Sequence, residues 1–352
     1  MSLLTFENIG ITGVSGVVPR NVVSNIDYEG PLSKKEIEKA IENTGIKERR
    51  IVDSETFTSD LFFAAADTLL NKLSIDRDSI NLFICVTQTP DYRQPPVSTI
   101  LQHRLGLSKS SGAYDINLAC AGYIYGLSTA FAFASIESVN RILLVVGETS
   151  SRMVSQKDRT TALLFGDGAA ASLIEKKPSS GKSYFSLNTD GQGEEALKIK
   201  GGGYRFPSSP NTIEMKQLSD GSSRSEEHLR MDGVEVFKFT MHEVVKDIRR
   251  VLDYSGVNID SIDNLVFHQS NKFMTDHFVK KLKFNSEKVP YSIEKFGNTS
   301  SASIPLTIVS ELKDEINQQD RLLLMSGYGG GLSWGTALVN FKQCKVLELL
   351  EI

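Results

Sequence analysis

Short apolar runs of strand length alternate with helical patterns along this chain of 352 residues, and this alternation restricts it to an α/β fold. The runs are rich in leucine and β-branched residues, which is typical of strands covered on both faces. We therefore predict strands at residues 81–87, 114–118, 141–147, 169–174, 264–268, 321–326 and 336–341. Helices are predicted at residues 34–43, 60–73, 97–105, 121–138, 234–255, 272–282 and 304–315.

The two halves of the chain repeat a similar pattern. The run Leu82-Phe-Ile-Cys-Val-Thr-Gln is similar to Leu265-Val-Phe-His-Gln, and Arg141-Ile-Leu-Leu-Val-Val-Gly is similar to Arg321-Leu-Leu-Leu-Met-Ser-Gly. This repetition suggests a duplicated fold, which we divide into residues 1–180 and 181–352. Residues 188–230 are rich in Gly, Ser, Pro and charge, which favours surface excursions around a short hairpin.

Charge, hydropathy and cysteine usage exclude several classes of protein. A net charge of −4 argues against a broad nucleic-acid surface. No apolar run reaches the length of a membrane span, and the N-terminus lacks a signal-peptide pattern. Three cysteines do not make a disulfide framework, and neither a Walker motif nor a cluster of metal ligands is present. We expect a reduced, cytoplasmic protein that binds no metal, nucleic acid or membrane.

Cys120 lies where a predicted strand meets a predicted helix, within Asp115-Ile-Asn-Leu-Ala-Cys120-Ala-Gly. A helix N-terminus lowers the pKa of a thiol, and the small neighbours of Cys120 leave space for a substrate. The helix that follows is apolar on all sides, so we expect it to be central and buried. Most free cysteines are simply small buried hydrophobes, and this is the interpretation for Cys85 and Cys344.

An imidazole and a carboxamide stand in two other segments with turn-forming neighbours. His268 ends a predicted strand at Val266-Phe-His268-Gln-Ser-Asn271, so its ring should emerge at the edge where α/β sheets bind ligands. Asn298 lies in Phe296-Gly-Asn298-Thr-Ser, ahead of a predicted helix. Either side chain can donate a hydrogen bond to a carbonyl oxygen. A structural histidine and a helix-capping asparagine are the alternatives.

The glycine-rich run Gly327-Tyr-Gly-Gly-Gly331-Leu-Ser-Trp-Gly335 follows a predicted strand. Such turns expose backbone N–H groups and let a ligand approach the chain closely. One of these N–H groups, together with that of Cys120, can form an oxyanion hole for a tetrahedral intermediate. Cys120, His268 and Asn298 are thus a sufficient set for acyl-thioester chemistry.

Six segments, in this order, resemble the β-ketoacyl-[acyl carrier protein] synthase III family of the thiolase superfamily. They are Thr44-Gly-Ile-Lys-Glu-Arg, Cys120-Ala-Gly, Phe165-Gly-Asp-Gly-Ala, His268-Gln-Ser-Asn, Gly297-Asn-Thr-Ser and Gly329-Gly-Gly-Leu-Ser-Trp-Gly. They extend across nearly the whole chain. The resemblance implies a thiolase-like, five-layered αβαβα fold of two similar halves, and a homodimer.

The resemblance also implies an acyltransferase that performs a ping-pong decarboxylative Claisen condensation. Cys120 would accept the acyl group, His268 and Asn298 would bind the carbonyl of a malonyl-type thioester, and the Cys120 and Gly330 N–H groups would hold the oxyanion. The substrates would be thioesters of coenzyme A or of phosphopantetheine on acyl carrier protein, with no bound cofactor. The implied substrate-binding residues are Thr44, Arg159, Met231, Gly233, Phe237, Ser270, Asn271 and Tyr328.

The sequence departs from the family pattern at two positions. Family members that use coenzyme A commonly stack its adenine between an arginine and an aromatic residue; Arg159 matches the arginine, but Lys39 occupies the aromatic position. Pro95 replaces the bulky residue that often bounds the acyl pocket across the dimer. Four lysines resemble basic positions around the family's tunnel mouth and are candidates for docking an acidic carrier protein, with solvated surface charge as the alternative: Lys238, Lys272, Lys280 and Lys281.

Three other functions use part of the same constellation. An enzyme that transfers the acyl group to an alcohol or amine, or that condenses two thioesters without decarboxylation, would keep the acyl-cysteine. A cysteine hydrolase also uses Cys, His and Asn in this order, and there Asn298 would contact the His268 ring. A catalytically silent binding protein would not need the Cys120 thiol.

Overall fold

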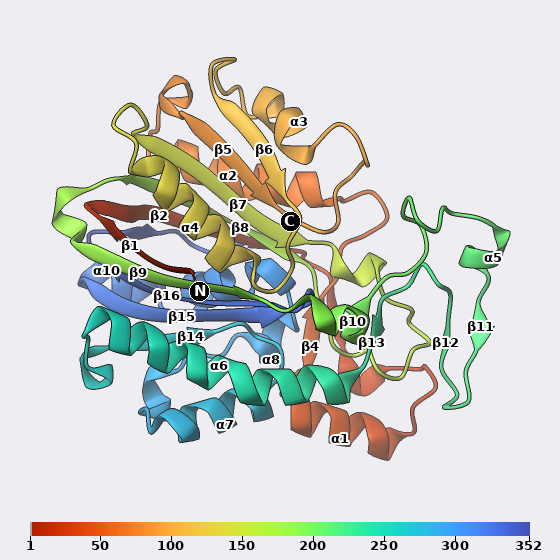
Figure 1. Ribbon diagram of the computed structural model, residues 1–352. Coiled ribbons are helices and arrows are strands. Elements are labelled where there is room, and N and C mark those ends of the chain that lie inside the picture. The colour runs from red at the N-terminus through yellow and green to blue at the C-terminus, as the bar shows by residue number, and fades with distance from the viewer. Residues whose placement is uncertain (1) are drawn as a thin grey trace.

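Two mixed β-sheets alternate with three layers of helices in the computed structural model, which describes residues 2–352 (Figure 1). Two helices lie between the sheets, and further helices cover the outer face of each. The order of the layers is α2 and α3, the first sheet, α4 and α9, the second sheet, then α6 and α7. The predicted five-layered αβαβα fold is therefore confirmed.

The first sheet has the strand order β17-β2-β8-β7-β5-β6, with β18 also paired to β2. Strand β5 runs parallel to both of its neighbours, whereas β8 is antiparallel to β7 and to β2. The strands are β2 (Ile9–Val18), β5 (Leu82–Val86), β6 (Gly112–Ile116), β7 (Arg141–Glu148), β8 (Gly168–Lys176), β17 (Lys345–Val346) and β18 (Leu350–Glu351).

The second sheet repeats this pairing scheme. Its order is β14-β15-β16-β9-β1, in which β14 and β15 are parallel and every other pair is antiparallel. The series β14-β15-β16-β9 thus matches β5-β7-β8-β2 of the first sheet. The second sheet also contains β1 from the N-terminus, and the first sheet contains β17 from the C-terminus. Each sheet thus includes a strand from the other half of the chain, and the division at residue 180 stays a prediction. The strands are β1 (Ser2–Glu7), β9 (Lys182–Thr189), β14 (Asn264–Phe267), β15 (Arg321–Gly329) and β16 (Ser333–Phe341).

Helix α4 (Gly122–Ala134) is the structural centre, and it packs against strands of both sheets. Its residues are small or apolar, as expected for a helix that meets protein on two sides. Phe131 of α4 contacts Phe185 of β9 and Phe6 of β1, with ring centroids 5.2 and 5.9 Å away. This aromatic cluster joins the central helix to the second sheet.

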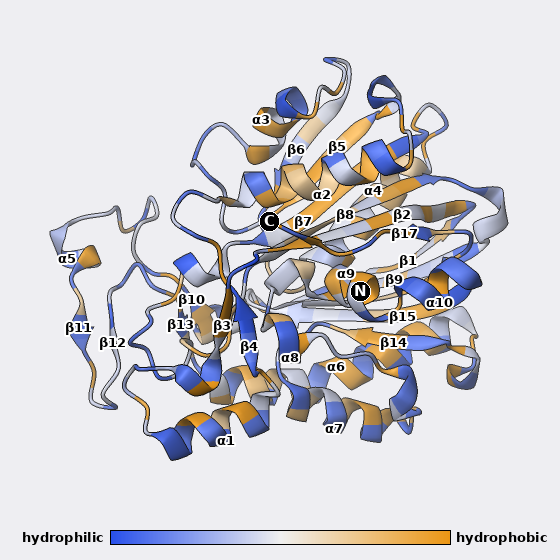
Figure 2. Cartoon of the chain, turned by 180° about the vertical axis from the view of Figure 1, so that it is seen from behind, coloured by the Kyte–Doolittle hydropathy of each residue, from blue (hydrophilic) through white to orange (hydrophobic). Residues whose placement is uncertain are grey.

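Figure 2 shows the apolar strands enclosed by outer helices that have polar outer faces. Within residues 2–352, no helix is both long and apolar enough to cross a membrane. The helices are α1 (Lys34–Thr44), α2 (Thr58–Lys72), α3 (Val97–Arg104), α5 (Pro210–Ile213), α6 (Gly233–Ser255), α7 (Lys272–Leu282), α8 (Ile293–Phe296), α9 (Ser303–Glu311) and α10 (Lys313–Gln318).

Residues 188–230 form the expected surface excursions, which project from the body of the molecule in Figure 1. They contain two small two-stranded ribbons, β10 with β13 and β11 with β12. A third ribbon pairs β3 with β4 near α1. These short strands are β3 (Val22–Ser24), β4 (Glu48–Arg50), β10 (Leu197–Lys198), β11 (Lys216–Gln217), β12 (Ser223–Arg224) and β13 (Arg230–Met231).

Several predicted boundaries were wrong. The helix predicted at 121–138 ends at Ala134, and the one predicted at 304–315 is divided into α9 and α10 at Leu312. The glycine-rich run does not simply follow a strand, because Gly327 and Gly329 lie inside β15 and only residues 330–332 form the turn. Strands β1, β2 and β9 were not predicted.

Candidate active site

Cys120 lies just before the N-terminus of α4, and strand β15 packs directly on it. A Cβ added at Gly329 would lie 2.6 Å from the Cβ of Cys120 and 3.0 Å from its Sγ. A Cβ at Gly327 would lie 3.0 Å from the Cys120 carbonyl oxygen. The glycines of β15 are therefore required for the close approach of this strand to the thiol.

Burial raises the pKa of the Cys120 thiol to about 12, and the nearby Glu148 carboxyl acts in the same direction. The Sγ lies 3.8 Å from the hydroxyl of Ser300, which lowers the pKa by a smaller amount. The expectation of a lowered thiol pKa is thus corrected. The shift from 9.0 corresponds to roughly 4 kcal/mol, whereas a helix N-terminus supplies only about 0.3–1 kcal/mol.

His268 follows β14 and is held by a serine from α9. Its Nδ1 lies 2.7 Å from the Ser303 hydroxyl oxygen, which also accepts a hydrogen bond from the backbone N–H of Gln269. When the Ser303 hydroxyl donates its proton to Nδ1, Nε2 carries the ring proton. Burial lowers the pKa of His268 to about 3, so the imidazole is neutral. A neutral Nε2–H is a donor for a carbonyl oxygen.

Asn298 is oriented by backbone hydrogen bonds between its own segment and residues 164–166. Its backbone N–H donates to Leu164 and its carbonyl accepts from Gly166. A Cβ at Gly166 would lie 2.0 Å from the Phe296 carbonyl oxygen, which explains the glycine there. The Asn298 Oδ1 accepts a hydrogen bond from the Ser300 backbone N–H, so the two hydrogens of Nδ2 are left for a ligand.

Two cavities meet at Cys120. The small cavity, of about 180 Å³, is lined by Cys120, His268 and Asn298 together. The large cavity, of about 700 Å³, is lined by Cys120, Ser300 and Gly330. The structure therefore brings the three predicted reactive side chains to one cavity and places the thiol at the junction with another.

Six of the predicted substrate-binding residues also line the small cavity, and two do not. Asn271 has a second role, because its Oδ1 caps α7 by accepting the Met274 N–H. Thr44 lines neither cavity, and its hydroxyl donates to the Ala40 carbonyl within α1. Arg159 also lines neither cavity. The six residues in the small cavity are Met231, Gly233, Phe237, Ser270, Asn271 and Tyr328.

The sequence did not single out several residues that complete the site. Ser300 contacts Cys120, and Ser303 contacts His268. The serine-rich run after Asn298 was the only feature of the sequence that pointed to these two serines. Apolar walls come from segments far apart in the chain, so no local pattern marks them. These wall residues of the small cavity are Leu164, Phe165, Leu197, Val236 and Met274.

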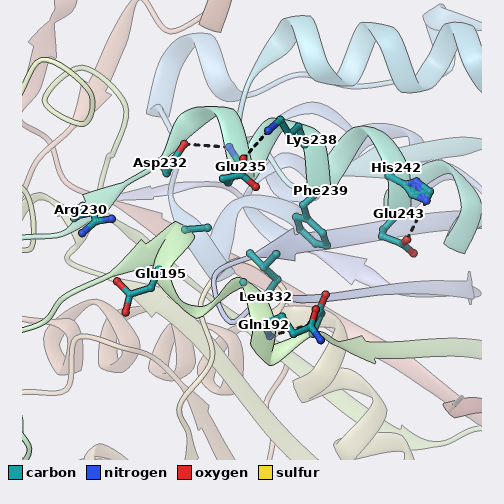
Figure 3. A pocket seen from close by; sticks show the side chains of 13 residues that line it. Gln192, Glu195, Arg230, Asp232, Glu235, Lys238, Phe239, His242, Glu243 and Leu332 are labelled. Carbon is teal, nitrogen blue, oxygen red and sulfur yellow. Dashed lines mark hydrogen bonds and ion pairs between the residues drawn. The ribbon is translucent and has the colours of Figure 1, made fainter.

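A third hollow, of about 480 Å³, lies between α6 and the turn at residues 191–196 (Figure 3). Its rim is charged and contains none of the three reactive residues. Lys238, one of the predicted docking lysines, lies here and pairs with Glu235 at 2.7 Å. Among residues 2–352, no group of three or more His, Cys, Asp or Glu side chains could hold a metal ion.

The geometry distinguishes between two arrangements of Cys, His and Asn. In the hydrolase alternative, Asn298 would contact the His268 ring. Here Ser303 contacts the ring instead, and the Asn298 Oδ1 is used by Ser300. The imidazole and the carboxamide thus line one cavity, and each has a different serine as its hydrogen-bond partner.

Comparisons with known proteins agree with this arrangement. Family models described as 3-oxoacyl-[acyl-carrier-protein] synthase III and its C-terminal part match residues 114–193 and 252–341. The β-ketoacyl-[acyl-carrier-protein] synthase III of Desulfitobacterium hafniense is 33% identical over 337 residues, covering 96% of this chain and 98% of the relative. The chain belongs to the β-ketoacyl-[acyl-carrier-protein] synthase III family.

Solved structures support the same family. The 3-oxoacyl-(acyl-carrier protein) synthase of Burkholderia xenovorans superposes with a TM-score of 0.92 at 35% identity, covering 100% of this chain and 99% of that one. The priming β-ketosynthase of the R1128 polyketide pathway has a TM-score of 0.82 at 28% identity, covering 95% and 96%. This member of the synthase III family is therefore a condensing ketosynthase.

Proposed function

We propose that this ketosynthase joins an acyl thioester to a malonyl-type thioester by ping-pong decarboxylative Claisen condensation. The observation that carries the proposal is that Cys120 lines both cavities, whereas His268 and Asn298 line only the small one. An acyl group on Sγ can extend into the large cavity while a second thioester enters the small cavity. Two substrates can thus use one thiol in turn.

In the first half-reaction, Cys120 Sγ attacks the carbonyl carbon of the acyl thioester. The backbone N–H groups of Cys120 and Gly330 hold the oxyanion of the tetrahedral intermediate. The carbon–sulfur bond of the donor then breaks, the acyl–Sγ bond remains, and the thiol proton leaves with the departing thiolate. Because burial favours the neutral thiol, this proton must be lost as the bond forms.

In the second half-reaction, the carbonyl of the malonyl-type thioester accepts hydrogen bonds from His268 Nε2 and Asn298 Nδ2. Departure of CO₂ leaves an enolate, which these two donors stabilise. The enolate carbon attacks the acyl carbonyl, the acyl–Sγ bond breaks, and Cys120 regains a proton from solvent. No general base is needed, because CO₂ leaves in place of a proton.

The remaining parts of the proposal concern partners. Residues of the small-cavity wall would contact the pantetheine arm shared by coenzyme A and acyl carrier protein. These steps need no bound cofactor. We place the enzyme in the cytoplasm, since its relatives' names refer to acyl carrier protein, a partner of cytosolic thioester chemistry. We propose a homodimer on the family resemblance alone.

The test is release of labelled CO₂ from a malonyl thioester in the presence of an acyl thioester. We expect one CO₂ for each 3-oxoacyl product, and a loss of about 10²–10³-fold in kcat for His268→Ala or Asn298→Ala, because each removes one carbonyl donor. His103→Ala, which changes a histidine that lines neither cavity, is the matched control. Acyl transfer without CO₂ release would contradict the proposal and favour non-decarboxylating chemistry.

A further inference from the structure

We propose that the Ser300 hydroxyl is a catalytic hydrogen-bond donor to Cys120 Sγ, and that it stabilises negative charge on the sulfur whenever the acyl–sulfur bond forms or breaks. Ser300 begins the short turn Ser300–Ala302 that precedes α9. This inference rests on the proposed function, in which Cys120 carries the acyl group. It assigns a partner to the sulfur itself, whereas the proposed roles of His268 and Asn298 concern the second thioester.

Ser300 is connected to all three reactive residues. Its hydroxyl oxygen lies 3.8 Å from Cys120 Sγ, and its backbone N–H donates to the Asn298 Oδ1 at 2.9 Å. Its carbonyl accepts a hydrogen bond from the Ser303 N–H, and the Ser303 hydroxyl contacts His268 Nδ1. The backbone of Ser300 is therefore used to place the carboxamide and the imidazole, while its hydroxyl contacts the sulfur.

The backbone of Ser300 has a conformation that L-residues rarely adopt. Its φ is 51°, in the left-handed region. The turn packs against α4 and β7, and only 3% of Ser300 is exposed. Such backbone geometry persists where the surrounding structure holds it, and it is concentrated at functional sites. The fold therefore fixes the hydroxyl beside the sulfur.

The contact between hydroxyl and sulfur becomes stronger when the sulfur is charged. Within residues 2–352, Sγ is the one hydrogen-bond partner that the structure gives the Ser300 hydroxyl. A thiolate has no proton to donate, so the hydroxyl must then be the donor. Hydrogen bonds to an ionised acceptor are shorter and stronger than neutral ones, and catalytic hydrogen bonds often tighten only as the reaction proceeds. A contact that strengthens as charge develops lowers the barrier to reaction.

The other side chains around the sulfur do not supply this stabilisation. Burial is the main cause of the raised pKa of Cys120 and the Glu148 carboxyl raises it further, whereas the Ser300 hydroxyl lowers it. Burial keeps two neighbours uncharged, because it lowers the pKa of His268 and raises that of Tyr328. Their polar atoms are also engaged elsewhere, with Ser303 and Ser270. Among these side chains, Ser300 is the one that favours the thiolate.

The same hydroxyl serves both half-reactions and keeps its own proton throughout. As Sγ attacks the acyl carbonyl carbon, the thiol proton leaves with the departing thiolate, and the Ser300 hydroxyl donates a hydrogen bond to the sulfur. In the second half-reaction, the acyl–Sγ bond breaks with both electrons on the sulfur. The hydroxyl then stabilises this leaving group until Cys120 regains a proton from solvent.

The test measures two rates at Cys120 by intact-protein mass spectrometry: acylation by a panel of acyl-pantetheines from acetyl to decanoyl, and alkylation by iodoacetamide across pH. We expect Ser300→Ala to lower the acylation rate by about tenfold or more, because a hydrogen bond to a charged group is lost. Alkylation at pH 9 should fall by about threefold or more, since a thiol with a higher pKa forms less thiolate but a more nucleophilic one. Alanine keeps the backbone N–H that orients Asn298.

Two further variants separate the hydroxyl from the backbone. Ser300→Gly also lacks the hydroxyl, and glycine adopts a φ of 51° without strain, so this variant should fold and show the same two losses. Ser301→Ala is the matched control, since it removes a neighbouring buried hydroxyl that has no hydrogen-bond partner within residues 2–352. Ser301 lines neither cavity, and its loss should change neither rate.

Each outcome has one meaning. Acylation rates of Ser300→Ala and Ser300→Gly within twofold of the wild-type rate would overturn the inference. Slower acylation with an unchanged alkylation profile would assign Ser300 a purely structural role, which overturns it as well. If no member of the panel acylates the wild-type protein, the proposed function itself fails, and slower alkylation of both variants would still support the hydroxyl as a donor to the thiolate.

Discussion

At the scale of single residues, Cys120 is subject to two opposing effects on its thiol. Its place before α4 favours the thiolate, while burial between α4 and β15 favours the neutral form. Burial is the larger effect, so the pKa rises to about 12. His268 is also buried, and its pKa falls to about 3. The resting site therefore holds a neutral thiol and a neutral imidazole.

We predict that Cys120 reacts slowly with iodoacetamide at pH 7.5 and that its alkylation rate keeps rising above pH 9. The raised thiol pKa leaves very little thiolate at neutral pH, and thiolate is the reactive species. The rate is measured by mass spectrometry against pH, with Cys120→Ser as the blank. A rate that reaches its plateau below pH 8 would show instead that the helix N-terminus outweighs burial.

At the scale of secondary structure, strand β15 and its glycines set the position of the thiol. We predict that Gly329→Ala destabilises the fold by about 1–3 kcal/mol and abolishes acylation, because the new Cβ would lie 2.6 Å from that of Cys120. Gly191→Ala is the matched control, since a Cβ there meets nothing within 4 Å. Chemical denaturation measures the change. Equal stability of the two variants would contradict this role of β15.

The ends of β5 and β7 are joined by a buried carboxyl. Glu148 accepts hydrogen bonds from the hydroxyls of Thr87 and Thr89 and from the Gln88 N–H, and burial raises its pKa to about 8. Between about pH 4.5 and 8 the unfolded carboxyl is ionised while the folded one keeps its proton. This group therefore reduces stability as pH rises through that window.

We expect Glu148→Gln to remove this pH dependence, because glutamine does not ionise. The wild-type protein should lose stability with a slope of up to about 1.4 kcal/mol per pH unit from this group, and the variant should not. Urea denaturation at pH 5, 6.5 and 8 measures the difference. The exposed Glu137→Gln serves as the control, and parallel curves for wild type and Glu148→Gln would be the contrary result.

The sequence indicated the buried strands and most helices because their side chains follow simple local patterns. It did not indicate β2, whose glycines at positions 10, 13 and 16 weaken the strand pattern. The structure explains all three glycines, because a Cβ at Gly10, Gly13 or Gly16 would lie within 3 Å of a side chain. These side chains are Ser180, Leu73 and Leu306, respectively. The requirement for glycine at these positions arises from tertiary packing, which leaves no local pattern in the sequence.

The same limit applies to the active site. Cys120, His268 and Asn298 were predicted because each stands in a distinctive segment. The hydrogen bond that orients His268 comes from Ser303, and the ion pair that occupies Arg159 comes from Glu36. Both contacts join segments that are separate in sequence, so their partners were not predictable from either segment alone.

At the scale of the whole molecule, α4 makes the two sheets one structural unit. Phe131 connects this helix to β9 and β1 of the second sheet, and its other neighbours belong to the same continuous apolar core as the first sheet. Cys120 lies just before α4, whereas His268 follows β14 of the second sheet. The position of the thiol relative to the imidazole therefore depends on the packing of α4.

We predict that Phe131→Ala lowers the stability by about 3–5 kcal/mol and that the protein still unfolds in a single transition. Removing the ring leaves a cavity between Phe6 and Phe185, which belong to the second sheet. Differential scanning calorimetry measures the midpoint and the number of transitions. Two separate transitions would mean that the sheets unfold independently.

In the proposed mechanism, Cys120 carries the acyl group between the two half-reactions. The most direct measurement is peptide mass spectrometry of the enzyme trapped with an acyl thioester and then chased with a malonyl thioester. We predict one acyl group, on the peptide that contains Cys120, and its disappearance during the chase with release of one equivalent of CO₂. An acyl group on any other residue, or one that persists through the chase, would contradict the mechanism.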